Sequence, residues 1–267
     1  MTPAAIIASE LSDIAQSLRE KDQPFAFATI VRTAGPTAAK PGAKALLAAD
    51  GTILEGWLGG GCARGAVKRA TLEALRSGMP QLISIAPEEF LAAKGIAAGT
   101  TQDGVSYARN GCPSKGTVDI FIEPCVPIPE LVVMGASPVA KALADLAPQF
   151  HWTVTASPDG TDLPQTSRQR FVVIATQGQG DLPALTAALG AGAHHISFVG
   201  STRKFAALSD TLTATDANAE AVASIKVPAG LDIHAVTPEE IALSILADLV
   251  RVRRSHIDTA KNPSFAP

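Results

Sequence analysis

The segment 130-ELVVMGASPVAKALADLA-147 decides the fold of the second half of the chain. It begins with an uninterrupted apolar run, which predicts a strand that is buried on both faces. Gly135 permits a tight turn after this strand, and the residues after Ser137 repeat their apolar side chains at helical spacing. This strand–turn–helix unit therefore predicts a parallel sheet with helices packed against it.

The same alternation continues towards the carboxyl terminus. The predicted strands are "WTVTAS", "FVVIATQ" and "HHISFVG", and the predicted helices include "DLPALTAALG" and "TPEEIALSILADLVRVRR". Thr237, Pro238 and Glu240 supply the last helix with an N-cap, a first-turn proline and a capping box. The second half is therefore predicted to be a Rossmann-like, doubly wound parallel sheet.

The first half has a mixed α/β pattern. We expect an amphipathic amino-terminal helix, a strand over 25–32, and two short strands joined by the hairpin turn Asp50-Gly51. A run of glycines then leads into a helix that should end near Gly78, and the segments "QLISIA" and "TVDIFIEP" predict two further strands. The region 87–116 between these strands is only weakly periodic.

A domain boundary is expected at 123-EPCVPIPE-130, where three prolines separate two predicted strands. We therefore predict a mixed α/β domain over 1–126, a Rossmann-like domain over 127–255 and a loose tail over 256–267. The fold class is α/β in both domains.

Composition excludes several classes of protein. The net charge of −3 and the lack of a basic stripe argue against nucleic-acid binding, and no apolar run is long enough for a membrane span. The three cysteines form no CxxC pair, which favours a reducing compartment over a disulfide framework or a structural zinc site. We expect a cytoplasmic protein.

The Rossmann-like half carries an altered dinucleotide fingerprint. Gly135, Ser137 and Ala140 stand where a G-x-G-x-x-A pattern is expected, so a serine replaces the middle glycine. The following strand ends in Ala156 without the acidic residue that usually holds a ribose, since Asp159 comes too late. The pattern supports the fold better than NAD binding, and the alternative is a Rossmann scaffold that is retained for its shape.

A second phosphate-binding candidate follows the strand "HHISFVG". Gly200, Ser201 and Arg203, with the neighbouring Lys204, open a helix whose backbone N–H groups suit a phosphate. Ordinary capping of a solvated helix explains the same residues. Asp181 has two interpretations as well, because it is both a helix-capping residue and a side chain at the carboxyl end of a parallel strand.

The stretch 56-GWLGGGCARGA-66 places successive glycines and a thiol between a strand and a helix. The N–H groups of Gly59, Gly60 and Gly61 can form an anion-binding concavity, and the helix dipole with Arg64 favours a Cys62 thiolate. Such a thiolate suits a nucleophile, a soft-metal ligand or a sulfur carrier. The alternative is a small packing residue.

Three other residues belong to this hypothesis. Lys40 and Lys44 lie in and after a loop that can approach the same face, and Cys112 is a second thiol in a turn-rich loop. Cys125, beside the interdomain prolines, is interpreted as structural.

The sequence resembles the XdhC/CoxI family of xanthine dehydrogenase accessory proteins. The likeness covers nearly the whole chain, through "TIVRTAGPTAAKPGAKALLAADGTI", "GGGCARGAV", "GTVDIFIEP", "LVVMGASPVAKALADLA", "FVGSTRKFAAL" and "VPAGLDIHAVTPEEIALSILADLV". The last of these segments is the most specific.

The resemblance implies a maturation factor without turnover of its own. Such a protein binds the molybdenum cofactor as cargo, as molybdopterin or its cytosine dinucleotide, and helps to load it into a molybdenum hydroxylase apoenzyme such as xanthine or carbon monoxide dehydrogenase. The family's glycine-cysteine motif falls on 59–62, with Cys62 as the expected molybdenum contact. The Rossmann-like domain is expected to take the nucleotide end, and a homodimer is expected.

The chain departs from the family pattern at three places. Arg64 stands where the family usually has an acidic residue, and "CPSKG" keeps only Cys112 of a Cys-Gly-Gly segment. A Thr-His-Asp type of segment becomes "TQGQGD", which keeps Thr176 and Asp181 but loses the histidine. These departures suggest a CoxF-like subgroup.

Two other functions compete with this expectation. One is an NAD(P)-dependent oxidoreductase that uses the Rossmann-like domain, against which Ser137 and the missing strand-end acid both argue. The other is a scaffold that binds the hydroxylase without a ligand. Neither function needs the glycine-cysteine corner.

Overall fold

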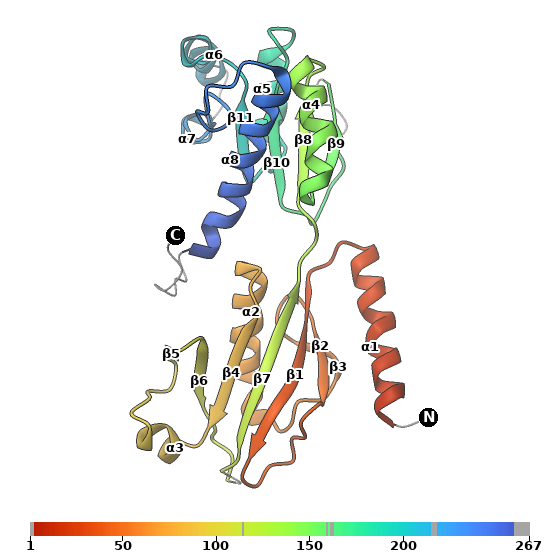
Figure 1. Ribbon diagram of the computed structural model, residues 1–267, viewed down its shortest axis with the longest axis vertical. Coiled ribbons are helices and arrows are strands. Elements are labelled where there is room, and N and C mark those ends of the chain that lie inside the picture. The colour runs from red at the N-terminus through yellow and green to blue at the C-terminus, as the bar shows by residue number, and fades with distance from the viewer. Residues whose placement is uncertain (1–2, 114, 159, 161–162, 215–217, 259–267) are drawn as a thin grey trace. The chain divides into compact units, whose positions relative to one another are not determined.

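The computed structural model describes residues 3–258 apart from 114, 159, 161–162 and 215–217, and leaves out the side chains of 3–9, Cys62 and 256–258. Contacts divide the chain into unit 1, which runs to Pro127, and unit 2, which spans Ile128–Asp258. Figure 1 shows the helices and strands of each unit. Each unit is described by itself.

Unit 2 is built on a parallel sheet in the order β11-β10-β8-β9. The strands are β8 (Glu130–Met134), β9 (Thr153–Ala156), β10 (Arg170–Ile174) and β11 (His195–Phe198). The chain order reverses between β8 and β10, which is the topological switch point at which ligands bind in open α/β sheets. The predicted Rossmann-like parallel sheet is confirmed.

Both faces of this sheet are buried, which explains the uninterrupted apolar run of β8. Leu131 and Val133 pack on one side with α4 and α8, whereas Val132 and Met134 pack on the other with α5 and α6. The helices are α4 (Pro138–Leu146), η2 (Ala147–Phe150), α5 (Asp181–Gly190), α6 (Thr202–Ala214), α7 (Ala219–Ala223) and α8 (Pro238–Asp258).

The last helix begins as predicted and ends later. Glu240 accepts hydrogen bonds from the Val236 and Thr237 N–H groups, and its own N–H donates to Thr237 Oγ1, which completes the capping box. The predicted tail begins at 256, whereas α8 continues to Asp258, because no proline or glycine interrupts the helix. Residues 259–267 lie outside the described residues. None of the described helices is both long and apolar enough to cross a membrane.

Unit 1 is built on one mixed sheet in the order β3-β2-β1-β7-β4-β6-β5. All its neighbouring strands are antiparallel except β4 and β6. The strands are β1 (Phe25–Ala34), β2 (Lys44–Leu47), β3 (Ile53–Gly56), β4 (Gln81–Ala86), β5 (Thr101–Gln102), β6 (Val105–Arg109) and β7 (Thr117–Cys125).

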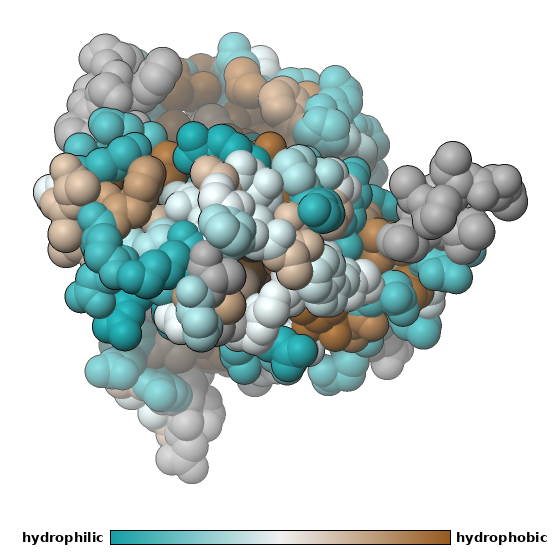
Figure 2. Space-filling model, turned by 90° about the horizontal axis from the view of Figure 1, so that it is seen from below, coloured by the Kyte–Doolittle hydropathy of each residue, from teal (hydrophilic) through white to brown (hydrophobic). Residues whose placement is uncertain are grey.

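Helices cover the two faces of this sheet. Val67 and Ala74 of α2 (Arg64–Ser77) pack against inward residues of the central strands, whereas Leu11 and Ala15 of α1 (Pro3–Glu20) pack on the opposite face. As predicted, α2 ends at Gly78, which has the left-handed conformation of a helix cap. Figure 2 shows hydrophobic surface in separate patches between hydrophilic residues.

The Asp50-Gly51 hairpin is confirmed, and the weakly periodic region contains short elements. The Asp50 carboxylate accepts hydrogen bonds from Thr52 N and Oγ1, which fixes the turn between β2 and β3. Region 87–116 holds α3 (Glu88–Ala93), β5 and β6. These elements were not predicted because α3 and β5 are short and β6 has no buried–exposed alternation.

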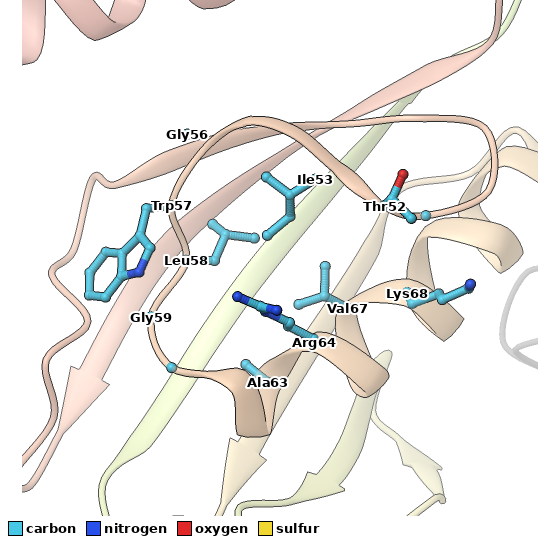
Figure 3. A pocket seen from close by; sticks show the side chains of 12 residues that line it. Thr52, Ile53, Gly56, Trp57, Leu58, Gly59, Ala63, Arg64, Val67 and Lys68 are labelled. Carbon is cyan, nitrogen blue, oxygen red and sulfur yellow. The ribbon is translucent and has the colours of Figure 1, made fainter.

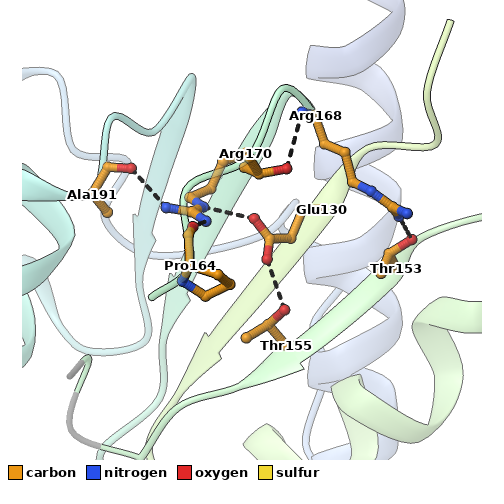
Figure 4. A network of polar contacts seen from close by, with 8 residues as sticks. Glu130, Thr153, Thr155, Pro164, Arg168, Arg170 and Ala191 are labelled. Atoms are coloured by element: carbon orange, nitrogen blue, oxygen red, sulfur yellow. Dashed lines mark hydrogen bonds and ion pairs between the residues drawn. The ribbon is translucent and has the colours of Figure 1, made fainter. Parts of the chain in front are cut away.

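A buried ion pair ties the amino ends of β8 and β10 together (Figure 4). Glu130 Oε2 accepts a 2.7 Å bond from Arg170 Nε, and both side chains are less than 10% exposed. Thr155 Oγ1 donates to the second carboxylate oxygen, and Arg170 also donates to the carbonyls of Pro164 and Ala191. This network therefore links β8, β9 and β10 to the segment that precedes β10 and to the end of α5.

Replacing Arg170 with methionine should lower the free energy of unfolding of unit 2 by about 3–5 kcal/mol, because Glu130 stays buried without its cation. Replacing both residues, as Glu130→Leu with Arg170→Met, should recover part of this loss. Urea unfolding followed by Trp152 fluorescence in a Trp57→Phe background measures the effect, since the chain has two tryptophans. A loss below about 1 kcal/mol for the single variant would contradict the assignment.

Candidate functional site

A cavity of about 450 Å³ lies in unit 1 between the β2–β3 hairpin, the glycine turn and the start of α2. In Figure 3, Thr52 and Lys68 lie towards one end of its lining, Gly59 and Ala63 towards the other, and Arg64 between them. Leu58 and Val67 are buried, at 3% and 2% exposure, and give it an apolar floor. The lining residues are Gly51, Thr52, Ile53, Gly56, Trp57, Leu58, Gly59, Gly60, Ala63, Arg64, Val67 and Lys68.

Gly56 is required where the chain leaves β3 for the cavity. Its φ is +87°, and a Cβ there would lie 2.8 Å from Ala45 Cα and closer than 3.0 Å to the carbonyl oxygen of Lys44. That same carbonyl accepts a 3.2 Å hydrogen bond from Trp57 N. Only a residue without a side chain allows β2 and the end of β3 to approach this closely.

Lys40 and Lys44 were expected to approach the glycine turn, but their side chains do not line the cavity. The Lys44 side chain is exposed on β2 and is not among the lining residues, and the same is true of Lys40 in the preceding turn. Lys44 instead contributes its backbone carbonyl, through the bond to Trp57. The structure therefore brings the strand of Lys44 to the site but not its ammonium group.

The three glycines of the turn differ in what the fold requires. Gly59 has a φ of +104°, so its backbone favours glycine. Gly60 is extended, with φ −68° and ψ 170°, and Gly61 begins the short helix η1 (Gly61–Ala63). A Cβ on Gly60 or Gly61 would meet no atom within 4 Å. Neither backbone conformation nor packing within the described part of the chain explains the missing side chains at these two positions.

The glycine turn also presents hydrogen-bond donors. Among the described residues, the N–H groups of Gly59, Gly60 and Gly61 donate to no protein acceptor, whereas the Gly60 and Gly61 carbonyls accept from Ala63 and Arg64. Cys62 lies in η1, directly before α2, so its backbone stands at the positive end of that helix. Its side chain lies outside the described residues.

Two cations extend from the first turns of α2. Arg64 and Lys68 both line the cavity, and neither forms an ion pair with a carboxylate in the described part of the chain. In Figure 3 the Arg64 guanidinium points towards Leu58 and Ile53, whereas the Lys68 ammonium points away from the glycine turn. Trp57 is 49% exposed, and its indole points away from Leu58. Trp57 and Lys68 were not predicted; Lys68 is recognisable by its i+4 spacing from Arg64.

The other two cysteines lie elsewhere in unit 1. Cys112 N donates to Asn110 Oδ1, and Asn110 Nδ2 donates to Gly116 O, which closes a tight loop; Cys112 is not among the lining residues. Cys125 ends β7 and packs in the cluster of Phe25 and α1. Burial raises the pKa of the Cys125 thiol more than the nearby Arg19 lowers it. These surroundings agree with the structural interpretation of Cys125.

At the switch point of unit 2, packing requires a glycine at position 135, and Ser137 serves as a helix cap. Gly135 has a φ of +106°, and a Cβ there would lie 2.8 Å from Thr176 Cα and still closer to the Ala175 carbonyl. Ser137 Oγ accepts a 3.1 Å bond from Ala140 N and caps α4. The end of β9 offers Ala156 and the buried Ser157 in place of a ribose-binding acid, and Asp159 lies outside the described residues.

Asp181 lies beside Gly135 in the fold and joins two loops. Its carboxylate, 8% exposed, accepts hydrogen bonds from Thr176 Oγ1 and Gly178 N and pairs with Lys204 Nζ. Burial alone would raise the pKa of Asp181, but the bonds from Lys204 and Thr176 and the Lys204 charge together lower it. The structure thus brings together Thr176 and Asp181 of the "TQGQGD" segment.

The predicted phosphate site at Gly200 is largely explained by the fold. A Cβ on Gly200 would overlap the Phe198 ring, and Ser201 Oγ accepts from Lys204 N to cap α6. Lys204 is paired with Asp181, and Arg203 is exposed at the helix start. Of these residues, Arg203 alone has its charge left for a ligand within the described part of unit 2.

The fold and the site define a two-unit α/β protein with a Rossmann unit and a separate cavity lined by glycines and cations. Residues 131–249 match the XdhC Rossmann domain, and residues 18–86 match the XdhC and CoxI family. The chain belongs to the XdhC and CoxI family.

Two further similarities were found. An uncharacterized protein of Escherichia coli strain K12, YqeB, is 28% identical over 265 residues, covering 90% of this chain and 46% of YqeB. The chain therefore spans about half the length of this curated relative. A solved structure described as a xanthine dehydrogenase from Bacillus halodurans is 18% identical, covers 95% of this chain and 98% of its own, and superposes with a TM-score of 0.41. A likeness at that level carries no argument about function.

The glycines should separate into two groups on substitution. Gly56→Ala should destabilise unit 1 by more than about 2 kcal/mol, because it combines a clash with a left-handed backbone. Gly60→Ala and Gly61→Ala should change stability by less than about 1 kcal/mol, and the exposed α2 variant Gly65→Ala should stabilise by about 0.5–1 kcal/mol. Urea unfolding of the full chain tests the series. If Gly60→Ala lowered the free energy of unfolding as much as Gly56→Ala does, the distinction between the two groups would be refuted.

Asp181→Asn should destabilise unit 2 by about 1–2 kcal/mol at pH 7, because it removes the charge that faces Lys204. Since the pKa of Asp181 is lowered by folding, its contribution is present above the ordinary value of 3.8 and is lost as the pH falls. The stability difference between wild type and Asp181→Asn should therefore shrink on acidification. A difference that is constant from pH 7 to pH 3 would exclude this role.

Proposed function

We propose that the chain is a maturation factor that binds the molybdenum cofactor as cargo and assists its insertion into a molybdenum hydroxylase such as xanthine or carbon monoxide dehydrogenase. Membership of the XdhC and CoxI family supports this role in general terms. The protein partner is then the hydroxylase apoenzyme, and the proposal includes a homodimer that works in the cytoplasm without turnover of its own.

The single observation that carries the proposal is the pair Gly60 and Gly61. Their backbones need no glycine, yet they stand beside a cavity with their N–H groups directed to no described acceptor. Glycine costs more conformational entropy on folding than any other residue, so two such positions need a reason outside the fold. A ligand that approaches the backbone closely supplies that reason.

The chemistry of the turn suits this cargo. The cofactor is an anionic pterin dithiolene with a phosphate, and unpaired N–H groups at the start of a helix bind anions. A thiolate is a soft ligand, and Cys62 lies in the short helix η1 that precedes α2. In this proposal, the Gly60–Gly61 backbone and the cavity hold the pterin, and Cys62 contacts the molybdenum.

Unit 2 is proposed to bind the nucleotide end when the cofactor is a dinucleotide. Gly135 lies at the switch point, where its missing side chain lets β8 pack against Ala175 and Thr176, and α4 begins directly after this turn. Because Lys204 is paired with Asp181, the donors for a phosphate there are backbone N–H groups and Arg203 rather than a lysine.

The test is to purify the protein from cells that make active cofactor and to measure bound molybdenum, pterin and nucleotides by elemental analysis and mass spectrometry. Cys62→Ser should fold normally, lose most of the bound molybdenum and activate the partner hydroxylase at least about tenfold less, since the hydroxyl is a poor soft ligand. Cys125→Ala, which removes a packed thiol, is the control and should retain molybdenum.

Other outcomes would assign other functions. Bound NAD(H) without molybdenum or pterin would overturn the proposal in favour of an NAD(P)-dependent oxidoreductase. A stable complex with the hydroxylase but no small ligand would indicate a scaffold. Full molybdenum binding and full activation by Cys62→Ser would reduce Cys62 to a packing residue.

A further inference from the structure

We infer that the unit 1 cavity recognises its ligand through a phosphate group held by Arg64, with Lys68 as a second, weaker cation. This inference rests on the proposed function and deepens it, because it assigns the anionic part of the ligand to particular side chains. The ligand class is an organic phosphate whose apolar or aromatic part lies against the floor of the cavity.

The electrostatics of α2 are unfavourable without a ligand. Arg64 is the first residue of the helix, and the first turn contains no acidic residue to complement the positive end of the dipole. Lys68 follows at i+4, so two like charges lie on the same helix face. Each arrangement destabilises the helix, and no carboxylate among the described residues forms an ion pair with either cation.

The acidic residue in the hairpin turn, Asp50, is already occupied. Asp50 lies in the hairpin that packs on α2 at Gly51, but its carboxylate accepts both hydrogen bonds from Thr52. The hydrogen bonds from Thr52 are the main cause of the lowered pKa of Asp50, and the charge of Lys68, which forms no ion pair with Asp50, is a minor one. Arg64 therefore has no protein anion to neutralise it within the described part of the cavity.

The direction of Arg64 makes this charge useful to a ligand. Its guanidinium points into the cavity, towards Ile53 and Leu58, between the glycine turn and the hairpin (Figure 3). Arg64 and Lys68 are both exposed, so a ligand that enters the cavity from solvent can reach either cation. The guanidinium fork matches two phosphate oxygens, which makes phosphate the favoured anion.

The surroundings of Arg64 fit an organic phosphate better than a free ion. Leu58 and Val67 are almost fully buried, and they leave an apolar surface beside the guanidinium. Gly59 and Gly60 belong to the lining as well, and a Cβ on Gly60 would meet no protein atom within 4 Å, so this part of the lining is open to a ligand. A ring system with one phosphate can contact this open part, the floor and Arg64 together.

Titration calorimetry with four probes tests the inference on the full chain, independently of any hydroxylase. The probes are 6-hydroxymethylpterin phosphate, 6-hydroxymethylpterin, cytidine 5′-monophosphate and inorganic phosphate. The pterin phosphate should bind at least about tenfold more tightly than the unphosphorylated pterin and than inorganic phosphate. A preference for cytidine monophosphate over the pterin phosphate would assign the cavity to the nucleotide end and would still require Arg64.

Variants then identify the cation. Arg64→Ala should weaken binding of the pterin phosphate by about tenfold or more and should hardly affect binding of the unphosphorylated pterin. Arg64→Glu should abolish binding of the pterin phosphate, and Lys68→Ala should weaken it less than Arg64→Ala does. Arg69→Ala removes the same charge from α2 outside the cavity lining and is the matched control. Thermal unfolding should show that Arg64→Ala is no less stable than wild type, because Arg64 has no described ion pair to lose.

Equal binding of phosphorylated and unphosphorylated pterin, an equal effect of Arg64→Ala and Arg69→Ala, or no binding of any probe by the wild type would each overturn the inference. Its failure is distinguishable from that of the proposed function. If equal amounts of molybdenum copurify with wild type and with Arg64→Ala, the maturation role is retained and Arg64 is not needed for it. If the protein binds a phosphate probe through Arg64 but never copurifies with molybdenum or pterin, the recognition site is retained and the maturation role is not.

Discussion

The close approach of two backbones at Gly56 and Lys44 is the constraint on which the unit 1 cavity depends. The missing side chain of Gly56 lets β3 end against the Lys44 carbonyl, which then binds the Trp57 N–H group. The following residues can therefore leave the sheet and turn towards α2, so that Leu58 comes to face Val67. Gly51 makes a second such approach to Lys68 at the other end of the hairpin. The first approach fixes the end of β3 against β2, the second sets the hairpin turn against α2, and the cavity lies between the hairpin and the helix.

Two cations at the candidate sites, Lys204 in unit 2 and Arg64 in unit 1, have opposite surroundings. In unit 2 the Lys204 ammonium is bound by Asp181, whose carboxylate is also held by Thr176, so the lysine stabilises the loops at the switch point. In unit 1 the Arg64 guanidinium is left without a described carboxylate and faces a cavity. A paired cation contributes to the fold, whereas an unpaired one beside an apolar floor is available to a ligand. This contrast makes unit 1 the stronger candidate for the recognition of an anionic cargo.

The sequence was informative where burial or turn chemistry is local. The apolar run of β8 predicted a sheet covered on both faces, and Asp50-Gly51 predicted the hairpin, because each pattern has one favourable structure. Elements such as α3, β6 and α7 were not predictable, since they are short and only partly buried. The glycine turn was recognised from its composition, but the distinction between Gly59 and Gly60 depends on backbone angles. The pairing of Lys204 with Asp181 joins two loops from different strands, so no local pattern reveals it.

The sheet order of unit 1 has a consequence for how the protein is made. Strand β7 pairs with both β1 and β4, and its pairing with β1 joins residues about 100 positions apart, such as Phe25 and Cys125. During synthesis β7, which connects the two halves of this sheet, therefore leaves the ribosome after all the other strands of the sheet. Until then α2 lacks Ile120 and Ile122, against which Val67 packs in the finished core. The core that supports the cavity is therefore complete only after the whole of unit 1 has been translated.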